Sequence, residues 1–257
     1  MSYAICNLSV IPVRKEPNDR SEMTTQILFG ETCFIKSTEK NWLQIETSID
    51  SYQGWIDSKQ VKIISEKYFK EHSAQSITCA VDMVHPVIRE DKSIPVLIGS
   101  TLPFFDGITL HIEKEKYVYN GVCYAASDMF NLSLFEKLAY KFLNAPYLWG
   151  GRSPFGIDCS GFTQIVYKIV GLPLKRDAYQ QFEQGKLIDF VEISKLGDLA
   201  FFSNDEGKII HVGIVLSPTS IIHASGRVRI DKLDAHGIYN QELKKYSHKL
   251  RAIKRII

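Results

Sequence analysis

The sequence predicts an α+β protein in which two small all-β domains precede a larger domain of helices and antiparallel strands. Short apolar runs separated by polar turns fill residues 1–64, and the same pattern returns over residues 77–125. From about residue 126 apolar side chains recur at helical spacing, and strand-like runs follow from residue 199. Helices succeeded by a series of strands are typical of an α+β domain.

The first predicted domain, residues 1–64, has the density of short strands found in small barrels of SH3-like topology. Residues 41–46 alternate polar and apolar side chains with a period of two, as in a half-buried strand. The expected strands are separated by turn-rich segments and cover residues 4–8, 32–36, 42–47, 54–56 and 61–64.

The second predicted domain, residues 65–125, begins with a linker and continues as a diverged copy of the first barrel. Residues 65–76 are polar and helix-permissive, and we interpret them as the linker. The run Gly99–Phe104 echoes Gly30–Phe34, which indicates a weak internal repeat. The dipeptide Asn120-Gly121 predicts a hairpin turn near the end of this domain.

The third predicted domain, residues 126–257, begins with helices. Ser133 to Glu136 has the form of a capping box before an apolar helix that ends near Asn144. A second helix begins at the turn Asp158–Gly161 and carries one apolar face. That face consists of Phe162, Ile165, Val166 and Ile169.

A third, short helix is expected to begin at Asp177, with Gln180 three residues on, and to end at Gly185. Strands then follow to the end of the sequence. They are expected at residues 199–202, 209–216, 221–224, 228–230 and 251–256.

Composition and charge exclude several classes of protein. The net charge is +2 and the basic residues are scattered, so we expect no nucleic acid partner. The five cysteines contain no CxxC pair, which argues against a zinc ribbon or a thioredoxin-type redox site. We find no targeting segment and no apolar stretch of about 18 residues. We therefore expect a cytoplasmic protein without membrane insertion.

Cys159 is the candidate nucleophile. It lies at the start of the second predicted helix, where free N–H groups and the helix dipole favour a thiolate and an oxyanion. Gly156 and Gly161 allow close approach of backbone and substrate. The alternative is a buried structural cysteine, against which the polar neighbours Asp158 and Ser160 argue. We expect the helix start to lower the pKa of this thiol.

His211 and His223 are the candidate partners of this thiol among the seven histidines. Each lies inside an apolar strand, and Gly213, on the same face as His211, leaves room for a neighbouring side chain. One imidazole would take the thiol proton and the other would orient it. The polar segments elsewhere hold histidines that we expect to be solvated, namely His72, His85, His236 and His248.

A zinc site made by Cys159, His211 and His223 is the rival interpretation. It would not need a thiol at a helix start, and such sites usually include a CxxC or HxxH pair, which is missing here. We expect no metal and no organic cofactor.

Four motifs in order resemble the NlpC-type cell-wall peptidases, which are papain-like cysteine enzymes. They are Tyr147-Leu148-Trp149-Gly150-Gly151, Asp158-Cys159-Ser160-Gly161-Phe162, His211-Val212-Gly213-Ile214-Val215 and His223-Ala224-Ser225. The resemblance covers residues 126–257, and the two N-terminal barrels resemble bacterial SH3-like domains. The whole arrangement is similar to that of the γ-D-glutamyl-L-diamino acid endopeptidases of the dipeptidyl-peptidase VI type.

The resemblance implies roles for individual residues. Cys159 would be the nucleophile, His211 the base and His223 the group that orients it. Tyr147 matches a tyrosine whose hydroxyl contributes to the oxyanion hole, although it could also be a packing aromatic. Two further residues, Asp158 and Ser160, match positions that line the substrate pocket, and Asp158 could equally cap the helix.

The resemblance also implies how substrate is recognised. Arg176 and Asp177 match a pair that contacts substrate, with helix capping as the alternative for Asp177. The first barrel would close the pocket and supply an acid for a free α-amine. Glu22 is the candidate acid, with an exposed, solvated glutamate as the alternative, and Tyr52 is a second candidate for the same wall.

The implied reaction is hydrolysis of the γ-D-glutamyl bond in short murein peptides with a free N-terminal L-Ala, during peptidoglycan recycling. Two alternatives remain open. One is a papain-like amidase or acyltransferase acting on another substrate, such as a lipid, against which the lack of a membrane-directed segment argues. The other is a cell-wall peptide-binding protein without catalytic activity, against which the intact Cys159, His211 and His223 argue.

Overall fold

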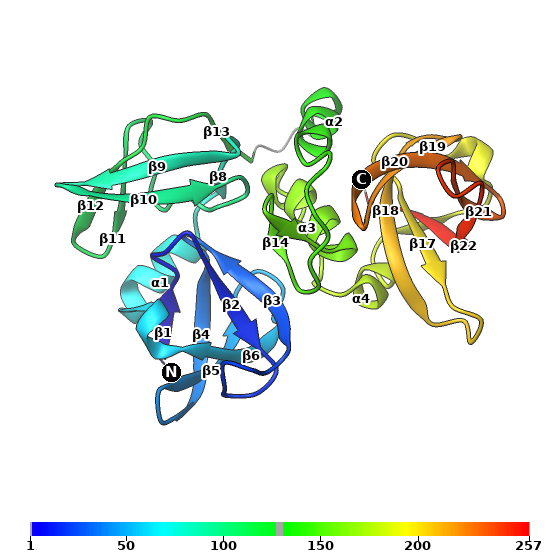
Figure 1. The fold of residues 1–257 in the computed structure, drawn as a ribbon. Helices are drawn as coiled ribbons and strands as arrows, with labels where there is room; N and C mark the ends of the chain where they lie inside the picture. The colour runs from blue at the N-terminus through cyan, green and yellow to red at the C-terminus, as the bar shows by residue number, and fades with distance from the viewer. Residues whose placement is uncertain (1, 127–130, 257) are drawn as a thin grey trace. The chain divides into compact units, whose positions relative to one another are not determined.

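The computed structural model describes residues 2–126 and 131–256 of the chain, and within it two compact units can be distinguished (Figure 1). The first unit comprises Met1–Met129, Trp149–Pro154 and Lys168–Pro173, and the second comprises Phe130–Leu148, Phe155–Tyr167 and Leu174–Ile257. The predicted boundary near residue 126 falls beside residues 127–130, which lie outside the described part of the chain.

The first unit begins with a seven-stranded antiparallel sheet in the order β3-β2-β6-β5-β4-β1-β7. The strands are β1 (Ser2–Ile5), β2 (Val10–Arg14), β3 (Met23–Leu28), β4 (Thr32–Glu39), β5 (Trp42–Thr47), β6 (Gln53–Asp57) and β7 (Lys62–Ile64), with a 3₁₀ turn, η1, at Ser58–Gln60. Burial alternates along β5 as its sequence predicts. Four of the five expected strands are confirmed; the first lies at Ser2–Ile5 instead of residues 4–8, and β2 and β3 are additional.

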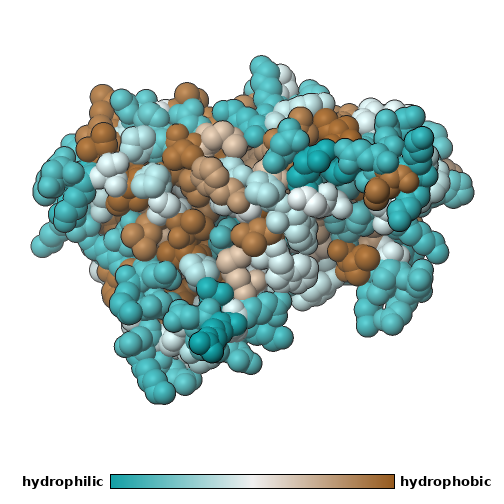
Figure 2. All heavy atoms as spheres, in the orientation of Figure 1, coloured by the Kyte–Doolittle hydropathy of each residue, from teal (hydrophilic) through white to brown (hydrophobic). Residues whose placement is uncertain are grey.

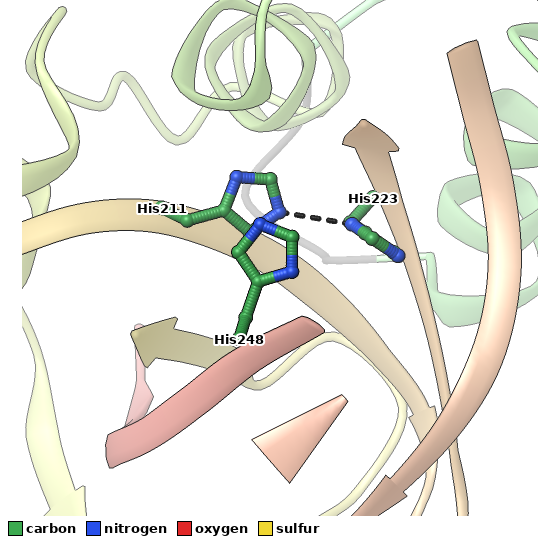
Figure 3. A group of neighbouring side chains, drawn as sticks. All are labelled: His211, His223 and His248. Atoms are coloured by element: carbon green, nitrogen blue, oxygen red, sulfur yellow. Dashed lines mark hydrogen bonds between the residues drawn. The ribbon is translucent and has the colours of Figure 1, made fainter. Parts of the chain in front are cut away.

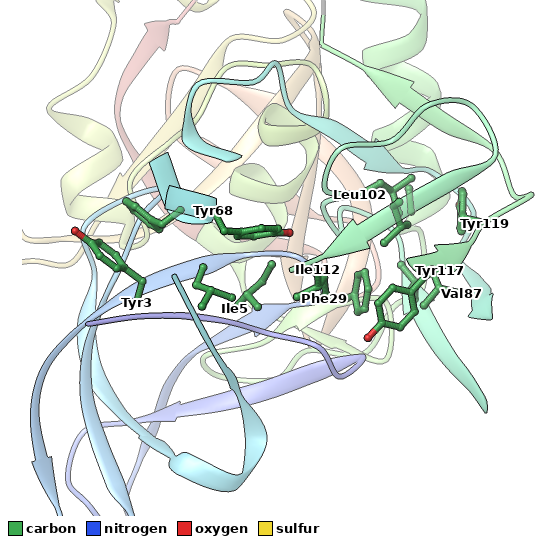
Figure 4. Packing of buried hydrophobic residues seen from close by; sticks show 14 residues of the cluster. Tyr3, Ile5, Phe29, Tyr68, Val87, Leu102, Ile112, Tyr117 and Tyr119 are labelled. Atoms are coloured by element: carbon green, nitrogen blue, oxygen red, sulfur yellow. The ribbon is translucent and has the colours of Figure 1, made fainter. Parts of the chain in front are cut away.

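Residues predicted as a linker form helix α1 (Glu66–Ser73) instead. Ser65 caps the helix, since its hydroxyl accepts a hydrogen bond from the Tyr68 backbone N–H at 3.2 Å. Tyr68 and Phe69 are buried in a core that the helix shares with both barrels (Figure 4). The helix therefore fills the core between the barrels, and a spacing rule based on its mostly polar sequence misses this.

The second barrel holds a four-stranded sheet in the order β10-β9-β12-β11 and the separate pair β13-β8. These strands are β8 (Thr78–Ala80), β9 (Val84–Arg89), β10 (Lys92–Leu97), β11 (Thr109–Ile112), β12 (Glu115–Val118) and β13 (Cys123–Ala125). The hairpin expected at Asn120-Gly121 is wrong, because β12 pairs with β11 and β13 pairs with β8. The β11–β12 turn uses Glu113, at φ 55°, instead.

A buried ion network lies within the first unit. Glu31 accepts hydrogen bonds from both terminal nitrogens of Arg152, at 2.7 and 2.9 Å, and from Lys168 Nζ at 2.6 Å. Lys168 also donates to the Gly99 carbonyl at 2.7 Å. Burial alone would raise the pKa of Glu31, but the two cations lower it to about 2. Arg152 belongs to the short strand β14 (Arg152–Ser153).

The second unit contains three helices: α2 (Leu132–Lys141), α3 (Cys159–Ile169), whose last two residues group with the first unit, and α4 (Ala178–Phe182). The capping box expected at Ser133 is wrong, because Asn131 Oδ1 accepts the Leu134 N–H at 2.9 Å and caps α2. The apolar face predicted for α3 is fully buried. The cap predicted for α4 is confirmed, since the Asp177 N–H donates to Gln180 Oε1 at 3.1 Å.

A second seven-stranded antiparallel sheet, in the order β16-β22-β17-β18-β19-β20-β21, completes this unit. An additional β21–β22 pairing closes six of its strands into a ring. The strands are β16 (Lys186–Ile188), β17 (Leu199–Ser203), β18 (Ile209–Ser217), β19 (Ser220–Ser225), β20 (Arg227–Asp234), β21 (Gly237–Asn240) and β22 (Lys245–Arg255). The unit also holds β15 (Gly156–Ile157) and the 3₁₀ turn η2 (Val191–Ile193).

Hydrophilic residues cover much of the face displayed in Figure 2, with hydrophobic residues interspersed among them. Among the described residues, none of the helices combines the length and apolar character needed to cross a lipid bilayer.

Candidate active site

The two predicted histidines lie side by side on neighbouring strands of the second unit. Gly213 of β18 pairs with His223 of β19, and His211 lies two residues before Gly213 on the same face. A Cβ on Gly213 would stand 2.8 Å from that of His223, so only glycine leaves room here. His211 Nε2 and His223 Nδ1 are 2.9 Å apart (Figure 3). The predicted pairing is confirmed.

The hydrogen-bond chain continues from His223 to Asp231 of β20, a residue that the sequence analysis missed. His223 Nε2 lies 3.1 Å from Asp231 Oδ2. The Arg229 guanidinium donates to both carboxylate oxygens of Asp231, at 2.6 and 3.0 Å. Burial alone would raise the pKa of Asp231, but hydrogen bonds from His223 and Arg229 hold it below its usual value. The carboxylate therefore stays ionised.

This chain determines which nitrogen of each imidazole carries the proton. Ionised Asp231 can only accept, so His223 Nε2 carries a proton and donates to it. His223 Nδ1 then accepts, and His211 Nε2 must be the donor at 2.9 Å. The lone pair of His211 is consequently at Nδ1. His211 is thus prepared to act as a base through Nδ1.

Cys159 begins helix α3, and its thiol lies against β18, the strand that carries His211. The backbone groups of Val212 and Ser160 hydrogen-bond to the sulfur and act to lower its pKa. Since Val212 follows His211 in β18, these contacts place the thiol beside the strand that carries the base. Asp158 caps the helix, because its Oδ1 accepts the Gly161 N–H at 2.7 Å.

The expected low pKa of the Cys159 thiol is wrong for this structure. Burial, followed by the negative charge of Asp158, raises the pKa well above the usual value for cysteine and outweighs the helix start. Burial also lowers the pKa of His211, and the neighbouring His223 and His248 lower it further. The resting pair is therefore a neutral thiol and a neutral imidazole, and burial was not visible in the local sequence.

Arg176 lies buried against the start of α3. Its guanidinium donates to both oxygens of Asp158, at 3.0 and 2.6 Å, and to the Ser160 hydroxyl at 2.9 Å. This ion pair partly neutralises the carboxylate that raises the pKa of Cys159. Arg176 thus holds two predicted pocket residues in place, and substrate contact by Arg176, Asp158, Ser160 or Asp177 stays a prediction.

Tyr147 lies close enough to the thiol for the two groups to interact. Burial, followed by the charges of Cys159 and Asp158, raises the pKa of Tyr147 to about 12. Its hydroxyl therefore remains a hydrogen-bond donor at neutral pH, as an oxyanion hole requires. The backbone N–H of Tyr147 donates to the Gly226 carbonyl at 3.0 Å, which fixes this segment against the loop that joins β19 and β20.

Glu22 and Tyr52 belong to the first unit. Glu22 is exposed, and its Oε1 accepts the indole N–H of Trp149 at 2.8 Å. The backbone N–H of Tyr52 donates to the Thr47 hydroxyl at 2.9 Å. Their contact with substrate stays a prediction.

The histidines of the second unit do not have the geometry of a metal site. His211, His223 and His248 place ligand atoms within 4.8 Å of one another. However, the rings of His211 and His248 are stacked, with 22° between their planes, so their in-plane lone pairs run side by side and do not converge on one ion. The rival zinc set with Cys159 is disfavoured, because both ring nitrogens of His223 have partners, Nδ1 with His211 Nε2 at 2.9 Å and Nε2 with Asp231 Oδ2 at 3.1 Å.

A thiol at a helix start, a base on an adjacent strand and a second imidazole that orients this base define a papain-like cysteine peptidase. Residues 144–248 match the NlpC/P60 family, and residues 13–61 match the bacterial dipeptidyl-peptidase Sh3 domain. The chain therefore contains an NlpC/P60 domain and an N-terminal SH3 domain of the bacterial dipeptidyl-peptidase type.

Curated relatives align with most of this chain. A γ-D-glutamyl-L-lysine dipeptidyl-peptidase of Bacillus cereus is 28% identical over 79% of this chain and 68% of its own length. Dipeptidyl-peptidase 6 of Lysinibacillus sphaericus is 28% identical over 89% of this chain and 91% of its own. The crystal structure of an NlpC/P60 family protein from Bacillus cereus superposes with a TM-score of 0.82 at 20% identity, covering 99% of both chains, which supports the fold.

Proposed function

We propose that this cell-wall peptidase hydrolyses the γ-D-glutamyl-L-diamino acid bond of short murein peptides that begin with a free L-Ala. The observation that carries the chemistry is the hydrogen-bond chain from Asp231 through His223 to His211, which leaves His211 Nδ1 as the base. The choice of bond is supported by the relatives from Bacillus cereus and Bacillus subtilis, which are γ-D-glutamyl-L-lysine dipeptidyl-peptidases.

The first half of the reaction forms a thioester. The Cys159 thiol gives its proton to His211 Nδ1, while the sulfur attacks the γ-carbonyl carbon of D-Glu. The carbonyl oxygen becomes an oxyanion that the Tyr147 hydroxyl and the N–H groups at the start of α3 stabilise. The C–N bond then breaks, and the His211 imidazolium protonates the leaving amine of the diamino acid.

The second half releases the product. His211 Nδ1 removes a proton from water, and the hydroxide oxygen attacks the thioester carbon. Collapse of the second tetrahedral intermediate frees L-Ala-D-Glu, and the Cys159 thiolate takes back the proton from His211. During both halves His223 and Asp231 stabilise the imidazolium, since a negative charge stands at the far end of the chain.

A carboxylate would bind the free L-Ala amine. Glu22 is our candidate for the carboxylate that binds the L-Ala ammonium, with Tyr52 in the same wall. The Glu22 carboxylate accepts a hydrogen bond from the Trp149 indole N–H at 2.8 Å and lies 3.7 Å from Lys15 Nζ. Replacing Glu22 by Gln should raise KM for the free peptide and leave kcat close to that of the wild type. An unchanged KM would show that Glu22 does not bind the substrate amine.

The direct test is cleavage of L-Ala-γ-D-Glu-diaminopimelate and of the matching L-lysine peptide, followed by mass spectrometry. We expect L-Ala-D-Glu as a product and no product with Cys159→Ala. Acetylation of the L-Ala amine should greatly reduce cleavage of the same peptide. No product from either peptide with the wild type would contradict the proposed bond specificity. Undiminished cleavage of the acetylated peptide would contradict recognition of the free amine.

We also propose that the protein acts in the cytoplasm on imported murein fragments, as expected from the sequence. Fractionation of cells that produce the native protein checks this, because recovery of the peptidase in the wall fraction would assign it to wall remodelling instead.

A further inference from the structure

His248 was expected to be solvated, but it lies on β22 beside the catalytic pair. Its ring stacks on that of His211, with 4.1 Å between centroids and 22° between planes (Figure 3). The ring of His223 stands nearly perpendicular to it, at 80°. Phe202 packs edge-on against His248 with centroids 5.9 Å apart. One face of the base is therefore covered by a third imidazole.

Two features hold the His248 ring in this position. Its Nδ1 lies 2.9 Å from the Ser247 hydroxyl, which in turn donates to the Ile238 carbonyl at 3.3 Å. The backbone of β22 also approaches β21 very closely, since a Cβ on Gly237 would stand only 1.9 Å from the His248 carbonyl oxygen. Gly237 has φ 138°, a conformation that suits glycine. The stacked position is thus fixed from the neighbouring strand.

On its other side His248 borders a surface hollow of about 740 Å³. The hollow is lined mainly by polar residues of the β17–β18 turn, the β20–β21 turn and β22. The titratable or charged residues that line it with His248 are Asp205, His236, Tyr246 and Lys249. His211 and His223 are only 5% and 1% exposed. His248 therefore lies between water in the hollow and a nearly dry pair of catalytic imidazoles.

We propose that His248 is a positioning residue, whose stacked ring keeps water from the His211–His223 hydrogen bond and so keeps the base oriented during catalysis. A hydrogen bond is stronger in a low-dielectric site, and water that competed for His211 Nε2 would weaken the orientation of the base. The inference concerns the site of the proposed function and rests on its cysteine–histidine chemistry, but on no particular peptide.

Charges around His248 favour its neutral form at working pH. Burial and the neighbouring His223 lower the pKa of His248 to about 4, while Asp231 acts in the opposite direction. Above about pH 5 the ring is therefore neutral and presents an uncharged π face to His211. Protonation of His248 at lower pH would place a positive charge beside His211. This charge would lower the pKa of His211, as the neighbouring His223 also does.

The test compares His248→Ala, which removes the ring, with His248→Phe, which keeps a stacked aromatic face. Lys249→Ala is the matched control, because Lys249 is exposed on the same strand and lines the same hollow. The first measurement is the titration of His211 by NMR of labelled imidazole, which needs no substrate. We expect the His211 pKa to rise by about one unit in His248→Ala, because water reaches the ring. It should stay within about half a unit in His248→Phe and in the control.

The second measurement is steady-state cleavage of the murein peptide. We expect kcat to fall about tenfold in His248→Ala with KM nearly unchanged, because orientation of the base is lost while substrate binding is kept. His248→Phe should recover most of the kcat. An unchanged His211 titration in His248→Ala, or equal damage in His248→Phe, would overturn the inference. If the wild type cleaves neither peptide, the NMR titration of His211 still tests whether His248 keeps water from the base.

Discussion

The two units each bury a charged network, but the networks serve different purposes. In the first unit Glu31 is neutralised by Arg152 and Lys168, and each cation donates directly to the carboxylate. In the second unit Asp231 meets Arg229 on one side and the neutral His223 on the other. In the first network both oxygens of Glu31 are held by cations, so neither is available as a base. The second network ends at His211 Nδ1, which can accept a proton. Buried charge alone therefore does not mark a catalytic site. A catalytic site is marked instead by a chain of hydrogen bonds that ends at a nitrogen able to accept a proton.

The largest expected effect comes from breaking the second network in the middle. His223→Ala would leave the His211 Nε2–H without its acceptor at 2.9 Å and would free the ring to adopt the wrong tautomer. We expect kcat to fall about 10³-fold, by analogy with the loss of the orienting group in a triad. Steady-state kinetics check this, and a circular dichroism spectrum like that of the wild type would show that the fold is kept. A kcat within tenfold of the wild type would assign the orienting role elsewhere.

Breaking the first network should change stability and not chemistry. The folded pKa of Glu31, about 2, lies below its ordinary value of 4.5, so the carboxylate stabilises the fold fully above pH 4.5 and loses this contribution as the pH falls towards 2. The shift corresponds to about 3 kcal/mol of unfolding free energy. Urea unfolding of Glu31→Gln at pH 7 should show this loss, and the difference from the wild type should shrink as the pH approaches 2.

A matched control for this stability test is Glu39→Gln, at the exposed end of β4, which should leave the unfolding free energy within about 0.5 kcal/mol. Folded Glu31→Gln should keep its kcat within about threefold of the wild type. A large loss of kcat with unchanged stability would contradict the division between the two networks.

Removing only the charge at the end of the second network should have a smaller effect. Asp231→Asn can still accept the His223 N–H through its amide oxygen, but it no longer balances the imidazolium. We expect kcat to fall about 30-fold. Glu242→Gln removes an exposed partner of Arg229 and should leave kcat within about twofold. Equal effects of the two substitutions would indicate that Arg229, and not Asp231, carries the orientation.

The smallest expected effect is a displacement of the pH profile. Because burial lowers the pKa of His211, this base stays unprotonated to lower pH than an ordinary histidine. The apparent pKa of the acid limb of the kcat/KM profile should therefore lie below about 6.5, the ordinary value for histidine. A limb at or above that value would show that His211 is hydrated in the working enzyme.

The sequence predicts the first part of the site well and the rest poorly, for a physical reason. Alternation within two apolar strands places His211, Gly213 and His223 correctly, because each strand has one buried face. Asp231 requires the register of β20, which extends from Arg227 to Asp234, and only residues 228–230 had the apolar pattern. A signal was present, since Arg229 and Asp231 share a face.

His248 and the thiol pKa depend on features that no local pattern contains. Strand β22 begins with the polar, mostly exposed residues 245–249, and His248 therefore lies before the segment 251–256 that was expected to be a strand. Its contact with His211 results from closure of the sheet through the β21–β22 pairing. The pKa of Cys159 is governed by burial, which only the assembled fold determines. The barrel strands, in contrast, follow from short apolar runs between turns.

The protonated resting state of Cys159 has a consequence for the lifetime of the protein. Peroxide oxidises thiolates far faster than thiols, and the first product, a sulfenic acid, leads on to irreversible forms. A thiol that is 7% exposed and has a raised pKa offers little thiolate between turnovers. The Cys159 sulfur should therefore react with peroxide mainly during a catalytic cycle, when His211 takes its proton, and only slowly in the idle peptidase.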